Sequence, residues 1–186
     1  MNAIPLLAIT ALACLASANV SAAGGPRSAD KVTGEYTYGS CFDCVPGDEL
    51  TNVAHSLLSA HEATGKSPQK GFQLSWRDDG LWFEIDLRDT ENSCVVVWAD
   101  GRARIGGLVS DGNGPQVGKY FGSLIMDEGE PAYFNDRKVT YRFPPTGRED
   151  FLAWCLDGEP DGATAIWPQV LIQGNIQVHN SPGDGD

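Results

Sequence analysis

The run of residues 81–87 sets an aromatic ring beside two carboxylates. Trp82, Glu84 and Asp86 alternate with apolar residues there, so a β-strand would put all three side chains on one face. Neighbouring carboxylates can raise one pKa and act as an acid–base pair, but a glycosidase needs them on both sides of the scissile bond, usually from different elements. We therefore assign no catalytic residue and predict that Trp82, Glu84 and Asp86 form a binding surface suited to a sugar.

A second group of oxygen ligands lies in an acidic turn farther along the chain. It contains Asp127, Glu128, Glu130 and Asp136, and Ca²⁺ prefers such carboxylate donors. The spacing lacks the alternating ligands and the distal bidentate glutamate of an EF-hand. The turn therefore predicts either a Ca²⁺ site or an exposed acidic turn whose shape Pro131 fixes. No other cofactor is expected.

The three histidines are His55, His61 and His179. On a straight strand His55 and His61 would share one face but lie about 20 Å apart, too far to bind a single metal ion together. His179 could approach His61 only through the fold. A mixed histidine–carboxylate metal site is therefore a weaker alternative to ordinary hydrogen-bonding roles.

Four cysteines lie beyond residue 23, namely Cys41, Cys44, Cys94 and Cys155. An even number in an exported chain indicates disulfide bonds, with the pairing left open. Cys94 and Cys155 each lie in an apolar run and could join two strands. Cys41 and Cys44 form a C-x-x-C pair, for which a redox centre or a zinc site are alternatives. Their loop-like flanks and the lack of a second close pair favour a disulfide.

Strands must position these residues, and apolar alternation predicts them. Phe72, Leu74 and Trp76 alternate before a turn at 77–80 that ends in Asp-Gly, and the chain returns through 81–87. An Asp-Gly pair between alternating runs is a strong hairpin signal. A second Asp-Gly turn joins the runs 94–98 and 102–105. Because arginines alternate with apolar residues in 102–105, one face of that hairpin is expected to be wet.

Further short runs separated by glycine- and proline-rich turns are also expected to be strands: 32–38, 118–126, 138–143, 151–156, 170–172 and 176–179. Trp76, Trp98 and Trp154 lie in apolar runs and are predicted to be core residues. Many short strands at such spacing predict an all-β fold, a single antiparallel sandwich or barrel-like domain of about 8–10 short strands.

The segment 49–63 is ambiguous. Val53, Leu57 and Leu58 have helix-like spacing among alanine and glutamate, which favours a helix by propensity. As a strand, the same segment would put Val53, His55 and Leu57 on one face. Both readings stay open on the residues alone.

The chain begins with 23 residues that contain no Asp, Glu, Lys or Arg. An apolar block followed by small residues there is typical of a signal peptide; a buried N-terminal helix and a lipoprotein signal at Cys14 are alternatives. We predict a signal peptide at 1–23, a secreted or periplasmic β-domain at 24–179 and a disordered tail at 180–186, with no membrane span after cleavage. The net charge of −12 argues against nucleic acid or an anionic membrane as a partner and suits solubility outside the cell.

Several stretches resemble an uncharacterised family of secreted bacterial β-domains. They are SAHE at 59–62, QKGF at 69–72, ARIGG at 103–107, MDEGEP at 126–131 with Asp136, and GNIQVH at 174–179. The resemblance implies an all-β extracellular or periplasmic domain near the cell envelope, favours a strand over 49–63, and brings no catalytic residue. The pair Cys41 and Cys44 and the stretch 158–161 do not match the family's motifs.

No nucleophile–base motif such as Gly-x-Ser-x-Gly or His-Glu-x-x-His is present. We therefore expect an extracellular or periplasmic binding or envelope-associated β-domain without enzymatic activity, whose partner is a cell-envelope or carbohydrate ligand. A carboxylate-dependent polysaccharide hydrolase using Glu84 and Asp86 is one alternative. A purely structural envelope component is the other.

Overall fold

The structure is a computed structural model that describes residues 30–40, 51–64, 67–129, 136–144, 146–158 and 164–179. At 51–52 and 164–168 it describes the backbone alone. The predicted leader, the predicted tail, Cys41, Cys44 and Glu130 lie outside the described residues.

Nine antiparallel strands pair in the order β4-β3-β2-β1-β9-β8-β7-β6-β5 within the described part of the chain. Their bounds are β1 Lys31–Ser40, β2 Thr51–His61, β3 Lys70–Trp76, β4 Trp82–Asp86, β5 Ser93–Val97, β6 Arg102–Gly112, β7 Tyr120–Met126, β8 Arg137–Arg142 and β9 Thr164–His179. Pairing of β4 with the end of β6 closes eight of the strands into a barrel, and β5 pairs with the first half of β6 as an extra strand. The all-β prediction is confirmed, in the form of a closed barrel. The ambiguous segment 49–63 contributes the strand β2.

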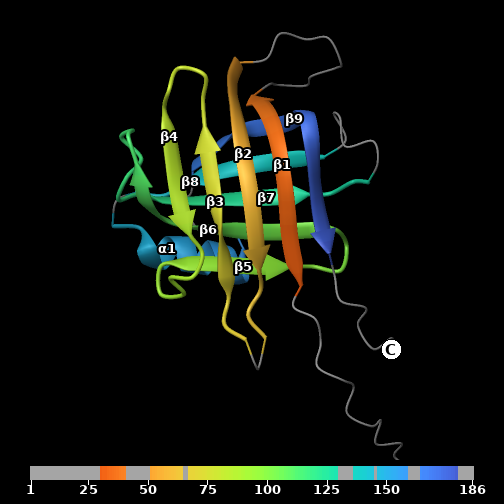
Figure 1. Ribbon diagram of the computed structural model, residues 1–186. Helices are drawn as coiled ribbons and strands as arrows, with labels where there is room; N and C mark the ends of the chain where they lie inside the picture. Colours follow the sequence, from red (N-terminus) through yellow and green to blue (C-terminus); the bar gives the residue numbers. More distant parts are fainter. Residues whose placement is uncertain are drawn as a thin grey trace, which may run out of the picture.

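The barrel is flattened into two layers that cross each other. In Figure 1 the strands β4, β3, β2 and β1 run vertically in front, and β8, β7, β6 and β5 cross behind them. The long strand β9 joins the layers, because it pairs with β8 through 164–170 and with β1 through 169–179. Register shifts at Tyr38 and Thr140 and a left-handed glycine, Gly174 (φ +88°), accompany this bend, as is usual where a strand changes sheets. A Cβ at Gly174 would lie 2.1 Å from the carbonyl oxygen of Glu35, so only glycine fits there.

Inward-facing side chains of both layers fill the barrel. The apolar ones are Val32, Tyr36, Tyr38, Ala54, Leu58, Ala60, Ile85, Leu87, Val95, Ala103, Ile105, Val109, Phe121, Ile125, Leu171 and Ile176. Several polar side chains are buried with them, notably Ser56, Gln73, Ser75 and Lys138. Tyr36 lies in register with Ser56 and Ser75, whose hydroxyl oxygens are 2.7 Å apart, so small side chains leave room for its ring.

In this arrangement the face of β3 that carries Trp76 points outward instead of into the predicted core. Gln73 and Ser75 face the interior, and the apolar set Phe72, Leu74 and Trp76 lies half-buried on the outer face. The prediction that Trp76 is a core residue is therefore wrong. Trp98 is also only half-buried, because it follows β5 at a turn where the guanidinium groups of Arg102 and Arg104 cover its ring.

Residues 151–156 were expected to form a strand and instead lie in a helix, α1 (Arg148–Asp157). Its buried residues Phe151, Trp154 and Cys155 have the i, i+3, i+4 spacing of one helical face. That face packs on the outside of the rear layer, where it forms a second apolar cluster with Tyr120, Tyr141 and Phe143. Figure 1 shows α1 behind the rear strands. A disulfide between Cys94 and Cys155, with Cα atoms 6.5 Å apart, joins α1 to β5, so this pair links a strand to a helix rather than two strands.

The outer face of β6 is only partly wet, in contrast to the expectation for 102–105. Arg102 is exposed and forms an ion pair with Asp100 at 2.7 Å. Arg104 lies against the end of α1, where its guanidinium donates to the carbonyl oxygens of Trp154 and Cys155. A cation near a helix C-terminus is attracted to the negative end of the helix dipole, so Arg104 helps to hold α1 on the barrel.

Candidate ligand-binding face

No described helix or strand covers the outer surface of the front layer, and in Figure 1 that surface is turned toward the reader. Outer residues alternate with buried inner ones along β1 to β4, so their identity follows from strand parity and register. We call this surface the ligand face. It comprises Thr33, Glu35 and Thr37 of β1, His55, Leu57 and Ser59 of β2, Phe72, Leu74 and Trp76 of β3, and Trp82, Glu84 and Asp86 of β4.

One end of the ligand face is an aromatic row. Strand pairing places His55 opposite Trp76, and Trp76 opposite Trp82. The rings of His55 and Trp76 are stacked, with centroids 5.4 Å apart and planes 20° from parallel. His55 is held from both sides, because its Nδ1 lies 2.9 Å from the hydroxyl oxygen of Thr37 and its Nε2 lies 3.1 Å from Oδ1 of Asp78. Two members of the row, His55 and Trp76, are therefore held in place by these contacts.

The next two rows combine apolar and acidic groups. Leu57, Leu74 and Glu84 are consecutive cross-strand partners, and Leu57 is 37 % exposed. Phe72 lies opposite Asp86 in the row beyond. The structure thus brings the three predicted binding residues, Trp82, Glu84 and Asp86, onto one surface with apolar partners. Among these partners is Trp76, which was predicted to be a core residue.

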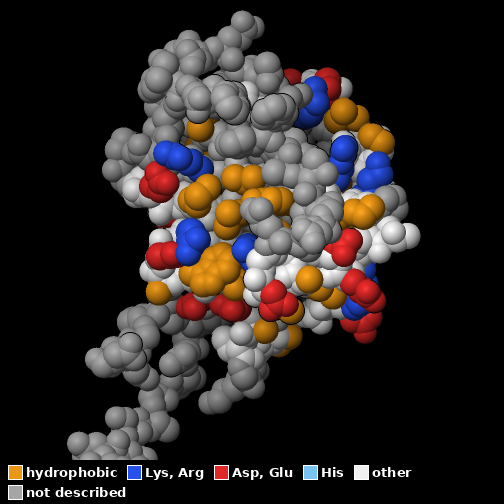
Figure 2. Space-filling view, turned by 180° about the vertical axis from the view of Figure 1, so that it is seen from behind, with side chains coloured by type: hydrophobic (Ala, Val, Ile, Leu, Met, Phe, Trp, Pro, Cys, Tyr) orange, Lys and Arg blue, Asp and Glu red, His pale blue; other side chains and the backbone are white. Residues whose placement is uncertain are grey.

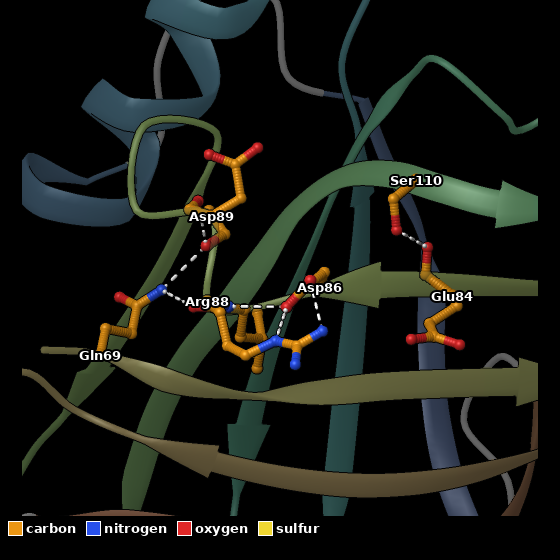
Figure 3. A network of polar contacts seen from close by, with 8 residues as sticks. Gln69, Glu84, Asp86, Arg88, Asp89 and Ser110 are labelled. Carbon is orange, nitrogen blue, oxygen red and sulfur yellow. Dashed lines mark hydrogen bonds and ion pairs between the residues drawn. The ribbon is translucent and has the colours of Figure 1, made fainter.

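The carboxylate of Asp86 is held by a neighbour. Arg88 donates from Nε to Oδ1 at 2.9 Å and from Nη2 to Oδ2 at 2.8 Å, as Figure 3 shows. These hydrogen bonds hold the pKa of Asp86 below its ordinary value. A general acid needs a raised pKa so that it carries a proton at neutral pH, and Asp86 is shifted in the opposite direction.

Glu84 has a different environment. Within the described part of the chain no hydrogen bond or ion pair reaches its carboxylate, and in Figure 3 that carboxylate points away from Ser110, whose hydroxyl bonds to the Glu84 carbonyl oxygen at 3.3 Å. Its partner across the barrel closure is Asp111 of β6. No local sequence pattern links Asp111 to Glu84, because only the pairing of β4 with β6 brings the two together.

Gln69 supports the end of β4 from inside the barrel. Its amide nitrogen donates to the carbonyl oxygen of Leu87 at 2.8 Å and to the hydroxyl of Ser93 at 2.9 Å, and its amide oxygen accepts from the Val95 nitrogen at 2.8 Å. This buried side chain therefore ties the chain after Asp86 to β5 (Figure 3). No periodicity signals such a residue, because a lone glutamine looks like a surface residue in sequence.

The acidic turn contributes its carboxylates to the sheet. Oδ2 of Asp127 accepts from the Val178 nitrogen at 2.9 Å, and Oδ2 of Asp136 accepts from the Ile176 nitrogen at 3.4 Å. These bonds satisfy β9 where it has left β8. Glu128 lies 3.8 Å from Arg137. In the residues that the structure describes no group of three or more His, Cys, Asp or Glu side chains could hold a metal ion, so the Ca²⁺ site stays a prediction.

The remaining histidines, His61 and His179, lie at the far end of the same layer. Each is a cross-strand partner of Lys31, on the two sides of β1. They are therefore one strand apart from each other, with a lysine between them.

The chain matches no family model. No curated protein and no solved structure matches it significantly either. The resemblance to a family of secreted bacterial β-domains therefore remains a prediction. Among the described residues, no helix has the length and apolar character needed to cross a membrane.

Proposed function

We propose that this protein is a non-enzymatic β-domain that binds a cell-envelope polysaccharide on its ligand face, outside the cytoplasm. The observation that carries the proposal is the aromatic row of His55, Trp76 and Trp82 in cross-strand register. Monomeric proteins rarely leave contiguous apolar patches uncovered, and such patches usually mark an interaction site.

The chemistry of the ligand face favours a sugar over a purely apolar partner. Sugar rings have one apolar face and a rim of hydroxyl groups. The flat rings of Trp76 and Trp82 suit the former, and the carboxylates of Glu84 and Asp86 can accept hydrogen bonds from the latter. Barrel closure adds a second argument, since β2 and β3 have neighbours on both sides and cannot bind a peptide by adding a strand.

Two features support a location outside the cytoplasm. The first is the uncharged apolar N-terminal stretch, and the second is the disulfide between Cys94 and Cys155, a bond that persists in oxidising compartments. Both accord with a partner in the cell envelope.

The proposal is tested by binding to purified peptidoglycan and to a panel of soluble polysaccharides, measured by co-sedimentation and affinity electrophoresis. We expect Trp76→Ala and Trp82→Ala to weaken binding by about tenfold or more, because buried aromatic anchors dominate binding energy. Trp98→Ala is the matched control, since this tryptophan is also half-buried but lies outside the ligand face. Equal binding by all four proteins, or none by the wild type, would refute the proposal.

The hydrolase alternative has one observation in its favour, the cross-strand pair of acids Glu84 and Asp111. The same incubations therefore include an assay for new reducing ends. Release that disappears in Glu84→Gln would replace the binding proposal with the hydrolase. A protein that neither binds nor cleaves any polysaccharide would favour the purely structural role.

A further inference from the structure

The end of the front layer farthest from the aromatic row carries a line of four basic side chains, which we call the basic row. His179 of β9, Lys31 of β1, His61 of β2 and Lys70 of β3 are consecutive cross-strand partners. They have the strand parity of the ligand face and continue it beyond the row of Ser59 and Phe72. Since His55 and His61 are six residues apart on β2, the basic row lies about 20 Å from the aromatic row.

This row stands out against the charge of the chain, which has 25 Asp and Glu against 13 Lys and Arg. None of the ion pairs between described residues involves Lys31 or Lys70. On the opposite side of the molecule, by contrast, basic and acidic side chains are interspersed (Figure 2). Burial and the charges of Lys70 and Lys31 hold the pKa of His61 below its ordinary value, which is the effect expected of like charges in adjacent strands.

Two nearby acids, Glu62 and Asp86, are engaged elsewhere. The Glu62 carboxylate accepts a hydrogen bond from the backbone of Val97 on β5, and burial and the charge of Asp30 raise its pKa. Glu62 therefore faces the rear layer and not the basic row. Asp86, at the adjacent row, is bound by Arg88 through two hydrogen bonds. An anion arriving from solvent would meet the two lysines at one end of the ligand face, because Glu35 and Glu84 lie at least two rows away along the strands.

We propose that Lys31 and Lys70, with His61 and His179, bind the acidic group of the polysaccharide, so that the ligand is an anionic glycan bearing carboxylate or phosphate. This inference rests on the proposed function and specifies its ligand class. The sugar rings lie on Trp76 and Trp82, and an acidic substituent farther along the same glycan chain meets the basic row. The ligand face then recognises both the sugar rings and the negative charge of one polymer.

The test compares probes that differ only in charge. Polygalacturonate and its methyl-esterified form share one backbone with and without free carboxylates, and dextran phosphate and dextran do the same for phosphate. We expect the charged member of at least one pair to bind at least tenfold more tightly, and the preferred pair to identify carboxylate or phosphate. Lys31→Gln/Lys70→Gln should lower affinity for that probe by about tenfold, the scale of two exposed charge contacts, whereas Lys119→Gln, a lysine outside the row, should not.

A direct readout accompanies the affinities. Binding of the acidic group beside His61 should raise the pKa of His61, followed by the NMR shift of its ring protons during titration, and Lys31→Gln/Lys70→Gln should abolish that rise.

The outcomes separate the two proposals. Equal affinity for charged and uncharged probes, unaffected by the lysine changes but lost in Trp82→Ala, would overturn the basic row and leave the proposed function standing. Failure of these probes, of peptidoglycan and of the whole polysaccharide panel to bind would overturn both.

Discussion

Lys138 is a charged side chain inside the barrel, 1 % exposed. Its ammonium lies 4.0 Å from the ring centroid of Tyr38 and 5.7 Å from that of Tyr36, close enough for cation–π attraction. Burial alone lowers the pKa of Lys138, but the two tyrosines outweigh it, and the net shift is upward. The two rings thus take the place of a counterion for a buried cation.

Tyr36 leads to a prediction about alkaline stability. Burial raises its pKa, and the nearby charge of Lys138 offsets only part of this rise. Tyr36 and Lys138 both hold their protons more tightly in the folded chain, so their contribution is intact below about pH 10 and is lost as the pH rises through the folded-state pKa values. Tyr36→Phe should therefore flatten the decline of the melting temperature between pH 9 and 11, and should change the unfolding free energy at pH 7 by no more than about 1 kcal/mol.

The control for that change is Tyr120→Phe. The Tyr120 hydroxyl donates to Oδ1 of Asn92 at 2.7 Å, so its removal should cost about 1 kcal/mol at pH 7 and leave the alkaline decline as steep as before. An equally steep decline in Tyr36→Phe would contradict this account of the barrel interior.

At the scale of elements, α1 lies on the barrel because one glycine leaves space for one tryptophan. A Cβ at Gly122 of β7 would lie 2.4 Å from the ring of Trp154, which is fully buried. The same ring packs against Tyr141 and Phe143, with centroids 5.1 and 5.7 Å away. The position of α1 is therefore set by the contact of the Trp154 ring with the backbone of β7 at Gly122.

Gly122→Ala should force Trp154 outward and lower the unfolding free energy by about 1–3 kcal/mol, the usual cost of overpacking a core. Urea unfolding measures the loss, and near-UV circular dichroism reports the displaced indole. Gly114→Ala is the matched control, because its Cβ would closely approach only the flexible end of Gln116. Equal stability of the two variants would show that α1 tolerates a gap over β7.

The elements also show how far the sequence could predict this protein. Alternation and Asp-Gly turns predicted the hairpins β3–β4 and β5–β6 correctly, because a period of two and a tight turn are local properties. The helix was mistaken for a strand because Phe151, Trp154 and Cys155 fit a short apolar run as well as a helical face. The outward orientation of Trp76 accompanies an inner face on which Ser56 and Ser75 leave room for Tyr36, two strands away in the same layer, and no local pattern encodes this. Trp82, Glu84 and Asp86 lie on one face as predicted, because they alternate along a single strand and their arrangement is a local property.

At the scale of the whole molecule, a disulfide within the second apolar cluster fastens α1 to β5. Cys94 lies on β5 beside the barrel, Cys155 lies on α1, and the two are 61 residues apart in sequence. Closing a loop of that length removes entropy from the unfolded chain and stabilises the fold by roughly 4 kcal/mol in the chain-entropy model.

Cys94→Ser/Cys155→Ser should therefore lower the unfolding free energy by roughly 4 kcal/mol, measured by urea titration under oxidising conditions. Addition of dithiothreitol should bring the wild type down to the level of the variant. If the variant and the wild type unfold at the same urea concentration under oxidising conditions, the disulfide adds nothing to the stability that packing provides.

The pairing of β1 with β9 has a consequence for how this protein is made. Lys31 and His179 are direct neighbours in the barrel, although almost the whole domain separates them along the chain. A ribosome synthesising the chain releases β1 early and β9 last, so the barrel cannot close until translation of the domain is complete. Until then β1 lacks one of its two partner strands. The order of the strands thus makes closure of the barrel the last step of folding.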